Sequence, residues 1–315
     1  MVYRDTIELE KLHKVMFIHN VTSGSQIFAF DFRQQIRILK AGLRVSCAQQ
    51  SYEEVELSSY EEMLKIGQRV CQEGIDWVVV AGGDGSLRAL VECFVQNDYY
   101  PYVSVFPAGT VNLVAKELNQ KNVATVWLEN VKKGRVTPVW LGKANDRIFL
   151  TVAGIGVDSL VVDKVGEKEK KYLSTLAYVR QGGIVAGQEL LLHNWKYKFQ
   201  VMVDDDGNWH EATSVIVSKS KYYAGKFYLT SGGSISKPAL YVCLFSGGKA
   251  VDFLRYVALI AADFLNLDRT VNVIEAQKVQ IKCNVNSFAA ELDGDSVATS
   301  PLNISLLPKP INFIS

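Results

Sequence analysis

Apolar runs recur through the first part of the chain, and longer amphipathic segments separate them. Runs at residues 14–19, 75–81 and 102–106 predict strands. The run at 75–81 is almost wholly apolar, as is typical of a parallel strand covered on both faces. Residues 43–47 are a further strand candidate. The pattern therefore indicates a buried sheet.

Helical spacing fills the intervals between these runs. Phe28, Phe32, Ile36 and Leu39 fall on one face of a helix over residues 28–40. A serine pair followed by acids predicts the start of a second helix, over residues 58–73. Further helices are expected at residues 87–95, 112–118 and 124–132. Alternating strands and helices predict a doubly wound α/β domain with a parallel sheet.

The pattern changes after residue 134. Residues 135–157 and 196–281 contain many short β-branched or aromatic runs, separated by clusters of Gly, Asn, Asp and Ser. Such spacing is typical of an antiparallel sheet or sandwich. We therefore expect an all-β domain over residues 135–301, with the boundary near Gly134-Arg135.

Composition narrows the class of protein. The 315 residues are 48% hydrophobic and 21% charged, with a formal net charge of +1, so a large core is expected and nucleic acid is not an expected partner. The five cysteines are odd in number and lack CxxC spacing, which favours free thiols in a reducing compartment. The N-terminus has no apolar signal region. A cytoplasmic protein is expected.

Gly82-Gly83-Asp84-Gly85-Ser86 follows a predicted buried strand and opens a predicted helix. Glycines let backbone N–H groups approach phosphate oxygens closely, and a helix N-terminus adds partial positive charge. Asp84 would repel phosphate directly, so its place in the loop indicates Mg²⁺ between the carboxylate and the phosphates. An ordinary strand-to-helix turn is the alternative interpretation.

Two more loops have similar chemistry. Pro107-Ala108-Gly109-Thr110-Val111-Asn112 and Asn20-Val21-Thr22-Ser23-Gly24 also follow predicted strands and supply hydroxyl and amide groups. In a doubly wound sheet all three loops lie at the carboxyl edge, where ligands bind. The sequence therefore predicts a nucleotide site at this edge.

A pair of carboxylates near the end of the β-rich region is a candidate for acid–base chemistry. Asp293 can accept the proton of an attacking hydroxyl during phosphoryl transfer, and Asp295 can help to hold Mg²⁺. An Asp-Gly hairpin turn at Asp293-Gly294 is the structural alternative.

In order and spacing, these motifs resemble the diacylglycerol kinase catalytic-domain family, which includes bacterial lipid kinases and the sphingosine and ceramide kinases. The resemblance extends over residues 14–307 and includes Ala153-Gly154-Ile155-Gly156-Val157-Asp158. It implies an α/β nucleotide domain followed by a lipid-binding β-sandwich, with the last strand returning to the first domain. That return suits residues 302–307, so we expect a first domain of residues 12–134 plus 302–315.

The resemblance also implies roles for single residues. Asp293 matches the general base, Asp84 the acid linked to Mg²⁺, and Asp158 a position near the substrate headgroup. The nucleotide-contacting positions are matched by Asn20, Ser23, Gly24, Gly82, Gly83, Gly85, Ser86, Pro107, Gly109, Thr110 and Asn112. Arg88, Ala89 and Asp295 depart from the family pattern, and Arg88 is interpreted either as a phosphate ligand or as a solvated helix residue.

These observations predict an ATP- and Mg²⁺-dependent kinase that phosphorylates a lipid hydroxyl, with diacylglycerol as the first choice. Ceramide or a sphingoid base, NAD, and a catalytically silent binding protein are the alternatives. The lipid implies peripheral contact with a membrane, for which residues 182–192 and 251–266 offer apolar surface and Lys164, Lys168, Lys170 and Lys171 offer charge. Helix packing in the core is the competing use of both apolar segments. Homodimer formation is left open.

Overall fold

The computed structural model describes residues 5–23, 29–156, 198–223, 225, 227–230, 232–284, 288–299 and 301–315. The chain divides into two compact units, which are described separately. The first unit comprises Met1–Val139 and Lys309–Ser315, and the second comprises Trp140–Pro308.

A mixed sheet forms the centre of the first unit. Within the described residues its strand order is β1-β6-β21-β5-β4-β2-β3. The strands are β1 (Asp5–Thr6), β2 (Lys14–Asn20), β3 (Ser51–Leu57), β4 (Trp77–Gly82), β5 (Tyr102–Pro107), β6 (Arg135–Val139) and β21 (Ile311–Ile314). Strands β2, β3, β4 and β5 are mutually parallel, as the alternating sequence pattern predicts.

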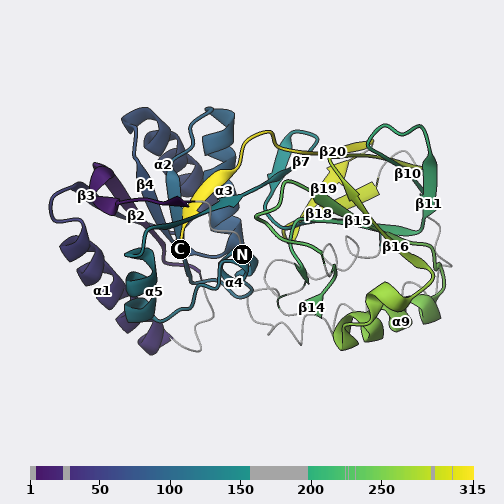
Figure 1. The fold of residues 1–315 in the computed structure, drawn as a ribbon, viewed down its shortest axis with the longest axis horizontal. Helices are drawn as coiled ribbons and strands as arrows, with labels where there is room; N and C mark the ends of the chain where they lie inside the picture. The colour runs from purple at the N-terminus through teal and green to yellow at the C-terminus, as the bar shows by residue number, and fades with distance from the viewer. Residues whose placement is uncertain are drawn as a thin grey trace. The chain divides into compact units, whose positions relative to one another are not determined.

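Helices cover both faces of this sheet (Figure 1). The helix α1 (Ala29–Ser46) packs with α5 (Ala124–Val131), and α2 (Tyr60–Glu73) packs with α3 (Asp84–Gln96). Alternate residues of β2 point to opposite faces, so Val15 and Phe17 join the core under α1 and α5. The doubly wound α/β arrangement is confirmed.

One predicted strand is wrong. Residues 43–47 belong to the C-terminal end of α1 and the turn after it, and the second strand of the sheet is β3. Strand β3 lies at the edge of the sheet and is largely polar, with Glu53, Glu54 and Glu56 paired to cations of neighbouring helices. Residues 43–47 therefore end a helix, and the charged residues 51–57 form the strand.

Two antiparallel sheets form the second unit, with the described orders β11-β10-β17-β20-β7-β8 and β16-β15-β12-β9-β18-β19. The strands of the first are β7 (Gly142–Ala144), β8 (Arg147–Phe149), β10 (Phe199–Val203), β11 (Trp209–Ala212), β17 (Lys278–Cys283) and β20 (Leu302–Leu306). Those of the second are β9 (Val152–Ile155), β12 (Ser214–Ser218), β15 (Leu240–Phe245), β16 (Val271–Ala276), β18 (Phe288–Leu292) and β19 (Asp295–Thr299). Both sheets contribute to one core, where Phe199 and Ile281 meet Val217 and Val242. The expected β-sandwich is confirmed.

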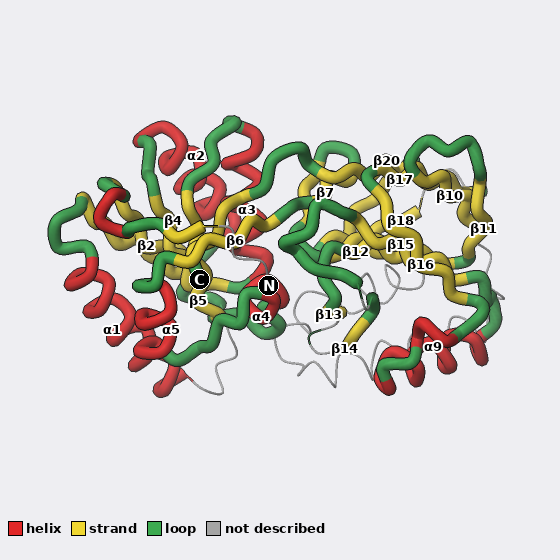
Figure 2. Tube along the Cα trace, in the orientation of Figure 1, coloured by secondary structure: helices red, strands yellow, loops and turns green. Residues whose placement is uncertain are grey.

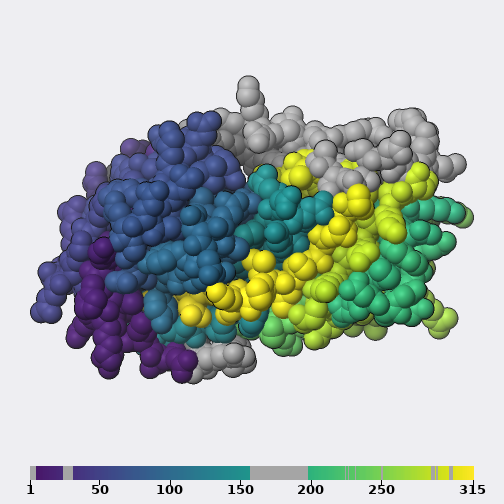
Figure 3. Space-filling model, turned by 90° about the horizontal axis from the view of Figure 1, so that it is seen from above, coloured from purple at the N-terminus to yellow at the C-terminus, as the bar shows by residue number. Residues whose placement is uncertain are grey.

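The strand that returns to the first unit is not the one expected. Strand β20, at residues 302–306, pairs with β17 and β7 and so belongs to the sandwich. The chain returns afterwards as β21, which lies between β5 and β6. Figure 3 shows these yellow C-terminal residues against blue and teal residues of the first unit. Both segments are apolar and follow one another closely, which is why the sequence pattern did not separate them.

The longest helix in the described part of the second unit is α9 (Ala250–Ala262), which precedes a short 3-10 turn, η3 (Leu265–Leu267). Across the described ranges, no helix has the length and apolar character needed to cross a bilayer.

Candidate nucleotide site and carboxylate turn

Three loops of the first unit follow β2, β4 and β5, and direct contacts join them. The end of β2 contacts the start of α3, because the Asn20 side-chain amide donates to Ser86 Oγ at 2.8 Å. The ends of β4 and β5 are paired, and the N–H of Ala108 donates to the carbonyl of Gly82 at 3.1 Å. The structure therefore brings the three predicted phosphate-binding loops together at one sheet edge.

Asp84 joins the second loop to the third. One carboxylate oxygen accepts the N–H of Leu113 at 2.8 Å, and the other accepts the N–H of Val114 at 3.2 Å. These two residues begin the short helix α4 (Leu113–Glu117), so Asp84 satisfies donors that the helix itself leaves without a partner. The carboxylate has a structural role that the sequence pattern did not reveal.

Asn112 fixes the shape of the third loop. Its side-chain oxygen accepts the N–H of Gly109 at 2.9 Å, and its amide donates to the Gly109 carbonyl at 2.6 Å. Asn112 itself is left-handed, with φ of 52°, a conformation that asparagine tolerates better than most residues. Thr110 is exposed beside it.

The glycines of the two loops differ in what surrounds them. A Cβ atom on Gly109 would lie 2.6 Å from the Cα of Gly83, so these glycines let two backbones touch. A Cβ on Gly85 would meet nothing within 4 Å. Gly85 lies in the first turn of α3, where backbone N–H groups have no intrahelical acceptor. Open space at a helix N-terminus fits a phosphate group.

The Gly82–Ser86 loop contains one carboxylate that could bind a metal, that of Asp84. Mg²⁺ is usually held by one or two carboxylates together with phosphate oxygens and waters, and Asp84 can supply such a ligand. Among the described residues, no cluster of three or more His, Cys, Asp or Glu side chains is arranged to bind a metal. The donor set thus suits a metal that arrives with a nucleotide.

The remaining predicted residues of the first loop are only partly described. The N–H of Ser23 donates to the Asn20 carbonyl at 3.1 Å, which closes the turn after β2. Gly24 lies outside the described residues, as do Asp158, residues 182–192 and the four lysines of residues 164–171.

His19 lies next to this edge and has an altered proton affinity. Burial lowers the pKa of its imidazole, and the nearby Glu56 carboxylate, 3.6 Å away, opposes that effect only in part. The ring stacks on Phe17 and also approaches Phe32. A neutral histidine is therefore favoured beside the first loop.

In the second unit, Asp293 and Gly294 form the two-residue turn between β18 and β19. Both are left-handed, with φ of 50° and 93°, so the predicted Asp-Gly hairpin is confirmed. Asp295 begins β19 and is exposed. The turn carries both predicted carboxylates on one short segment.

The Asp293 carboxylate accepts four hydrogen bonds from the segment between β8 and β9. One oxygen accepts the N–H of Leu150 at 2.6 Å. The other accepts the N–H groups of Thr151 and Val152 at 2.8 and 3.1 Å, and the Thr151 hydroxyl at 2.7 Å. The side chain is thus held in one orientation, and Thr151, which sequence analysis missed, supplies two of the four donors. The hydroxyl just before the Ala153–Asp158 motif is the signal that could have revealed it.

The position of Arg88 excludes one of its two sequence interpretations, that of a solvated helix residue. Its side chain is 1% exposed, so it is not a solvated helix residue. Glu92, one turn later on α3, is 5% exposed. Residues at i and i+4 share a helix face, and buried charges require partners of opposite sign. Arg88 and Ala89, the two residues of this helix that depart from the family pattern, are therefore both buried.

Comparison with known proteins supports the architecture. Residues 14–144 match the model of the diacylglycerol kinase catalytic domain, and residues 151–315 match that of the YegS C-terminal NAD kinase beta sandwich-like domain. The chain belongs to the diacylglycerol kinase family. Its members are lipid kinases, so this chain is a kinase.

Individual relatives match over nearly their whole length. A Streptococcus pneumoniae protein named only as a lipid kinase is 24% identical over 310 residues, covering 96% of this chain and 98% of its own. A diacylglycerol kinase from Staphylococcus aureus is 25% identical over 298 residues, covering 82% and 91%. A crystal structure of a diacylglycerol kinase from Bacillus anthracis superposes with a TM-score of 0.70 at 17% identity, covering 96% and 97%, and so shares the fold.

Proposed function

We propose that this lipid kinase transfers the γ-phosphoryl group of ATP, with Mg²⁺, to the hydroxyl of diacylglycerol at a membrane surface. The proposal that the protein binds ATP rests on one observation. This is the open space at Gly85, in the first turn of α3, among three linked loops. The names of the Staphylococcus and Bacillus relatives support diacylglycerol as the acceptor.

The first unit would bind the nucleotide through backbone rather than side-chain charge. The N–H groups at the start of α3 would face phosphate oxygens, and the N-terminal end of the helix dipole favours anions. Asp84 would hold Mg²⁺, which would neutralise the phosphate charge when bound. Because Asp84 also holds the N–H groups of Leu113 and Val114, its carboxylate is already oriented.

Asp293 would accept the proton of the lipid hydroxyl. Four donors from residues 150–152 would hold its carboxylate in one orientation for this step. Phosphoryl transfer passes through a loose transition state, so catalysis depends mainly on positioning and on electrostatic stabilisation. Correct placement of the hydroxyl then matters more than basic strength.

Labelled ATP tests the proposal directly. The purified protein is incubated with Mg²⁺ and vesicles that carry diacylglycerol, ceramide, sphingosine or monoacylglycerol, and with free NAD as a separate acceptor. Transfer to diacylglycerol above the other acceptors is expected, and it should disappear with EDTA. Transfer to ceramide, to sphingosine or to NAD instead would reassign the acceptor. ATP binding without transfer to any acceptor would identify a silent binding protein.

A further inference from the structure

The outward side of α9 and η3 carries exposed apolar side chains. Val251, Leu254, Phe264 and Leu267 are 62%, 59%, 54% and 69% exposed, and we call these four residues the α9 face. Ala258 and Ala261 are exposed on the same helix, and their spacing from Leu254 places them on the same stripe. An exposed apolar stripe along a helix, continued by Phe264 and Leu267 just after it, is typical of a contact surface.

The opposite side of the same helix anchors it in the sandwich. Tyr256 and Leu265 are 6% and 3% exposed and pack with Ile216 and Phe245 of the sheet. The competing interpretation of residues 251–266 as a core helix is therefore correct for this inner side. The α9 face contributes nothing to that core, so its apolar character needs another explanation.

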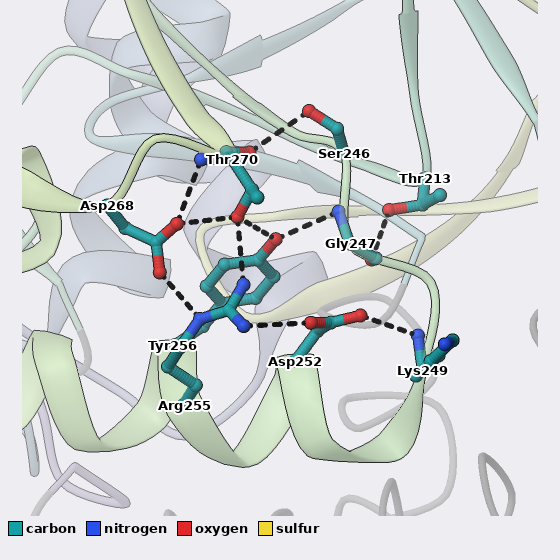
Figure 4. A network of polar contacts seen from close by, with 9 residues as sticks. All are labelled: Thr213, Ser246, Gly247, Lys249, Asp252, Arg255, Tyr256, Asp268 and Thr270. Carbon is teal, nitrogen blue, oxygen red and sulfur yellow. Dashed lines mark hydrogen bonds and ion pairs between the residues drawn. The ribbon is translucent and has the colours of Figure 1, made fainter.

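A polar network fixes the helix to the sheet (Figure 4). Arg255 contacts Asp268 at 2.6 Å and Asp252 at 3.0 Å. The Tyr256 hydroxyl lies 2.8 Å from the Thr270 hydroxyl and accepts the N–H of Gly247 at 2.9 Å. These contacts hold the α9 face in a fixed orientation.

The network also leaves an excess of accessible cations. The Asp252 and Asp268 side chains are only 16% and 8% exposed, because both turn toward Arg255. Lys249 and Arg269 flank the α9 face, are exposed, and form no ion pair with any residue in the described ranges. Of the three acids on this segment, only Asp263 is exposed. The accessible charge thus complements an anionic surface.

A tyrosine hairpin lies beside the helix. Strands β13 (Tyr222–Tyr223) and β14 (Phe227–Tyr228) form this hairpin, and β14 contacts α9. Figure 2 shows both strands and α9 along the same edge of the second unit. The Tyr222 and Tyr228 rings lie 5.2 Å apart, and the Lys221 ammonium lies 4.9 Å from the Tyr222 ring centroid. Tyrosine and lysine are characteristic of the bilayer interface.

We propose that the α9 face docks onto a lipid bilayer, with α9 lying in the plane of the interface. Its apolar side chains would enter the boundary between headgroups and acyl chains, as amphipathic interfacial helices do. Lys249 and Arg269 would lie near anionic headgroups. This inference rests on the proposed function, because a lipid acceptor reaches the enzyme from a membrane.

Vesicle flotation tests the docking surface with the full chain. The protein is mixed with phosphatidylcholine vesicles, with or without phosphatidylglycerol, in the absence of ATP. The triple variant V251S/L254S/L267S should bind at least about tenfold more weakly, since it removes three apolar side chains from the contact. The control V45S/V126S changes two exposed valines of the first unit and should bind as wild type. The K249E/R269E variant should lose only the gain from phosphatidylglycerol.

Several results would overturn the proposal. These are flotation of the triple variant equal to wild type, no binding of the wild type to either vesicle, or a shift from dimer to monomer with flotation unchanged. Should the triple variant not fold, L254W provides a second test. Its fluorescence, measured against wild type, should shift to the blue when vesicles are added, and no shift would contradict docking.

Activity separates the docking surface from the kinase function. The triple variant should phosphorylate a short-chain, water-dispersed diacylglycerol as wild type does, while losing transfer to vesicle-borne diacylglycerol by about tenfold or more. Equal losses on both substrates would overturn the docking role. Normal flotation with no transfer to any lipid would refute the proposed function and leave the docking surface supported.

Discussion

Glycines 83, 85 and 109 occupy neighbouring positions yet meet different surroundings. Gly83 and Gly109 are required because two backbones touch, whereas Gly85 faces open space. At the residue scale, this difference separates glycines that the fold needs from one that the fold does not need. The sequence motif alone treats all three as equivalent.

Gly85→Ala should leave stability unchanged or raise it slightly, since alanine is about 1 kcal/mol better than glycine inside a helix. It should weaken ATP binding by about tenfold or more, because the methyl group fills the space proposed for phosphate. Calorimetric titration with ATP and thermal unfolding measure the two effects.

Gly109→Ala serves as the matched comparison. Its Cβ would collide with the Gly83 backbone, so the variant should lose about 1–3 kcal/mol of stability as well as ATP affinity. If Gly85→Ala binds ATP like wild type, the phosphate does not lie beside Gly85.

Asp293→Asn should slow transfer by about 10²–10⁴-fold while ATP affinity stays within about tenfold of wild type. It should also cost about 1–3 kcal/mol of stability, because the new amide group points donors at backbone N–H groups. Transfer assays, ATP titration and urea unfolding measure these three quantities.

Thr151→Val is the control for the loss of hydrogen bonds to the Asp293 side chain. It removes one hydroxyl donor but keeps the carboxylate and its three backbone donors, so it should cost about 1 kcal/mol of stability and retain transfer. Full activity of Asp293→Asn would show that this carboxylate is not the base. Equal loss of activity in both variants would show that the turn, rather than proton transfer, limits the reaction.

At the scale of elements, most of the first unit follows from local pattern. The apolar runs before Asn20, Gly82 and Pro107 are strands β2, β4 and β5, and Ser59 caps α2 through the N–H of Glu62. The sequence pattern did not predict strand β3, because its charges are paired with residues of helices elsewhere in the sequence. Arg69, for example, binds Glu53 at 2.6 Å. Long-range pairing of this kind leaves no periodic signal.

The candidate site was likewise predictable in its parts but not in its contacts. Strand-to-helix loops with glycine and asparagine locate the sheet edge that binds ligands. No local pattern shows that Asp84 holds the start of α4, or that Asp293 holds the β8–β9 segment. These contacts join residues far apart in sequence, so they depend on the assembled sheets.

The edge formed by β2 and β3 should respond to pH through His19. Burial lowers the pKa of this imidazole in the folded protein, whereas the unfolded chain keeps the ordinary value of 6.5. As the pH falls through 6.5, the unfolded chain therefore takes up a proton before the folded protein does. The contribution of His19 to the free energy of unfolding is therefore complete above pH 6.5 and is lost as the pH falls below it.

Thermal unfolding of wild type and His19→Gln at neutral and mildly acidic pH tests this expectation. The wild type should lose more stability on acidification than the variant does. Identical slopes for wild type and His19→Gln would remove His19 as the cause.

At the scale of the whole molecule, the chain builds one unit, then the other, and then returns. The returning strand β21 is essential to the first sheet, since it lies between β5 and β6 and buries Ile311 and Phe313 completely. The Ser104 hydroxyl donates to the Ile314 carbonyl at 2.7 Å, which ties this strand to β5. The loops after β2, β4 and β5 therefore belong to a sheet that includes residues 311–314.

Removal of residues 309–315 should unfold the first unit selectively. Three buried side chains of β21 are lost, at about 1.5–3 kcal/mol each, and β6 loses its neighbour in the sheet. Limited proteolysis with mass spectrometry should show rapid cleavage within residues 1–139, while fragments of residues 140–308 persist. ATP binding should disappear at the same time.

Lys309→Ala is the matched control for this truncation. It removes only an exposed ion pair with Asp98, at 2.9 Å, and exposed pairs are worth about 0–1 kcal/mol. Its proteolysis pattern should equal that of wild type. If the truncated chain keeps a protected first unit and binds ATP, the sheet closes without β21 and the last strand is dispensable. If both units become sensitive together, they unfold as one cooperative body rather than as two.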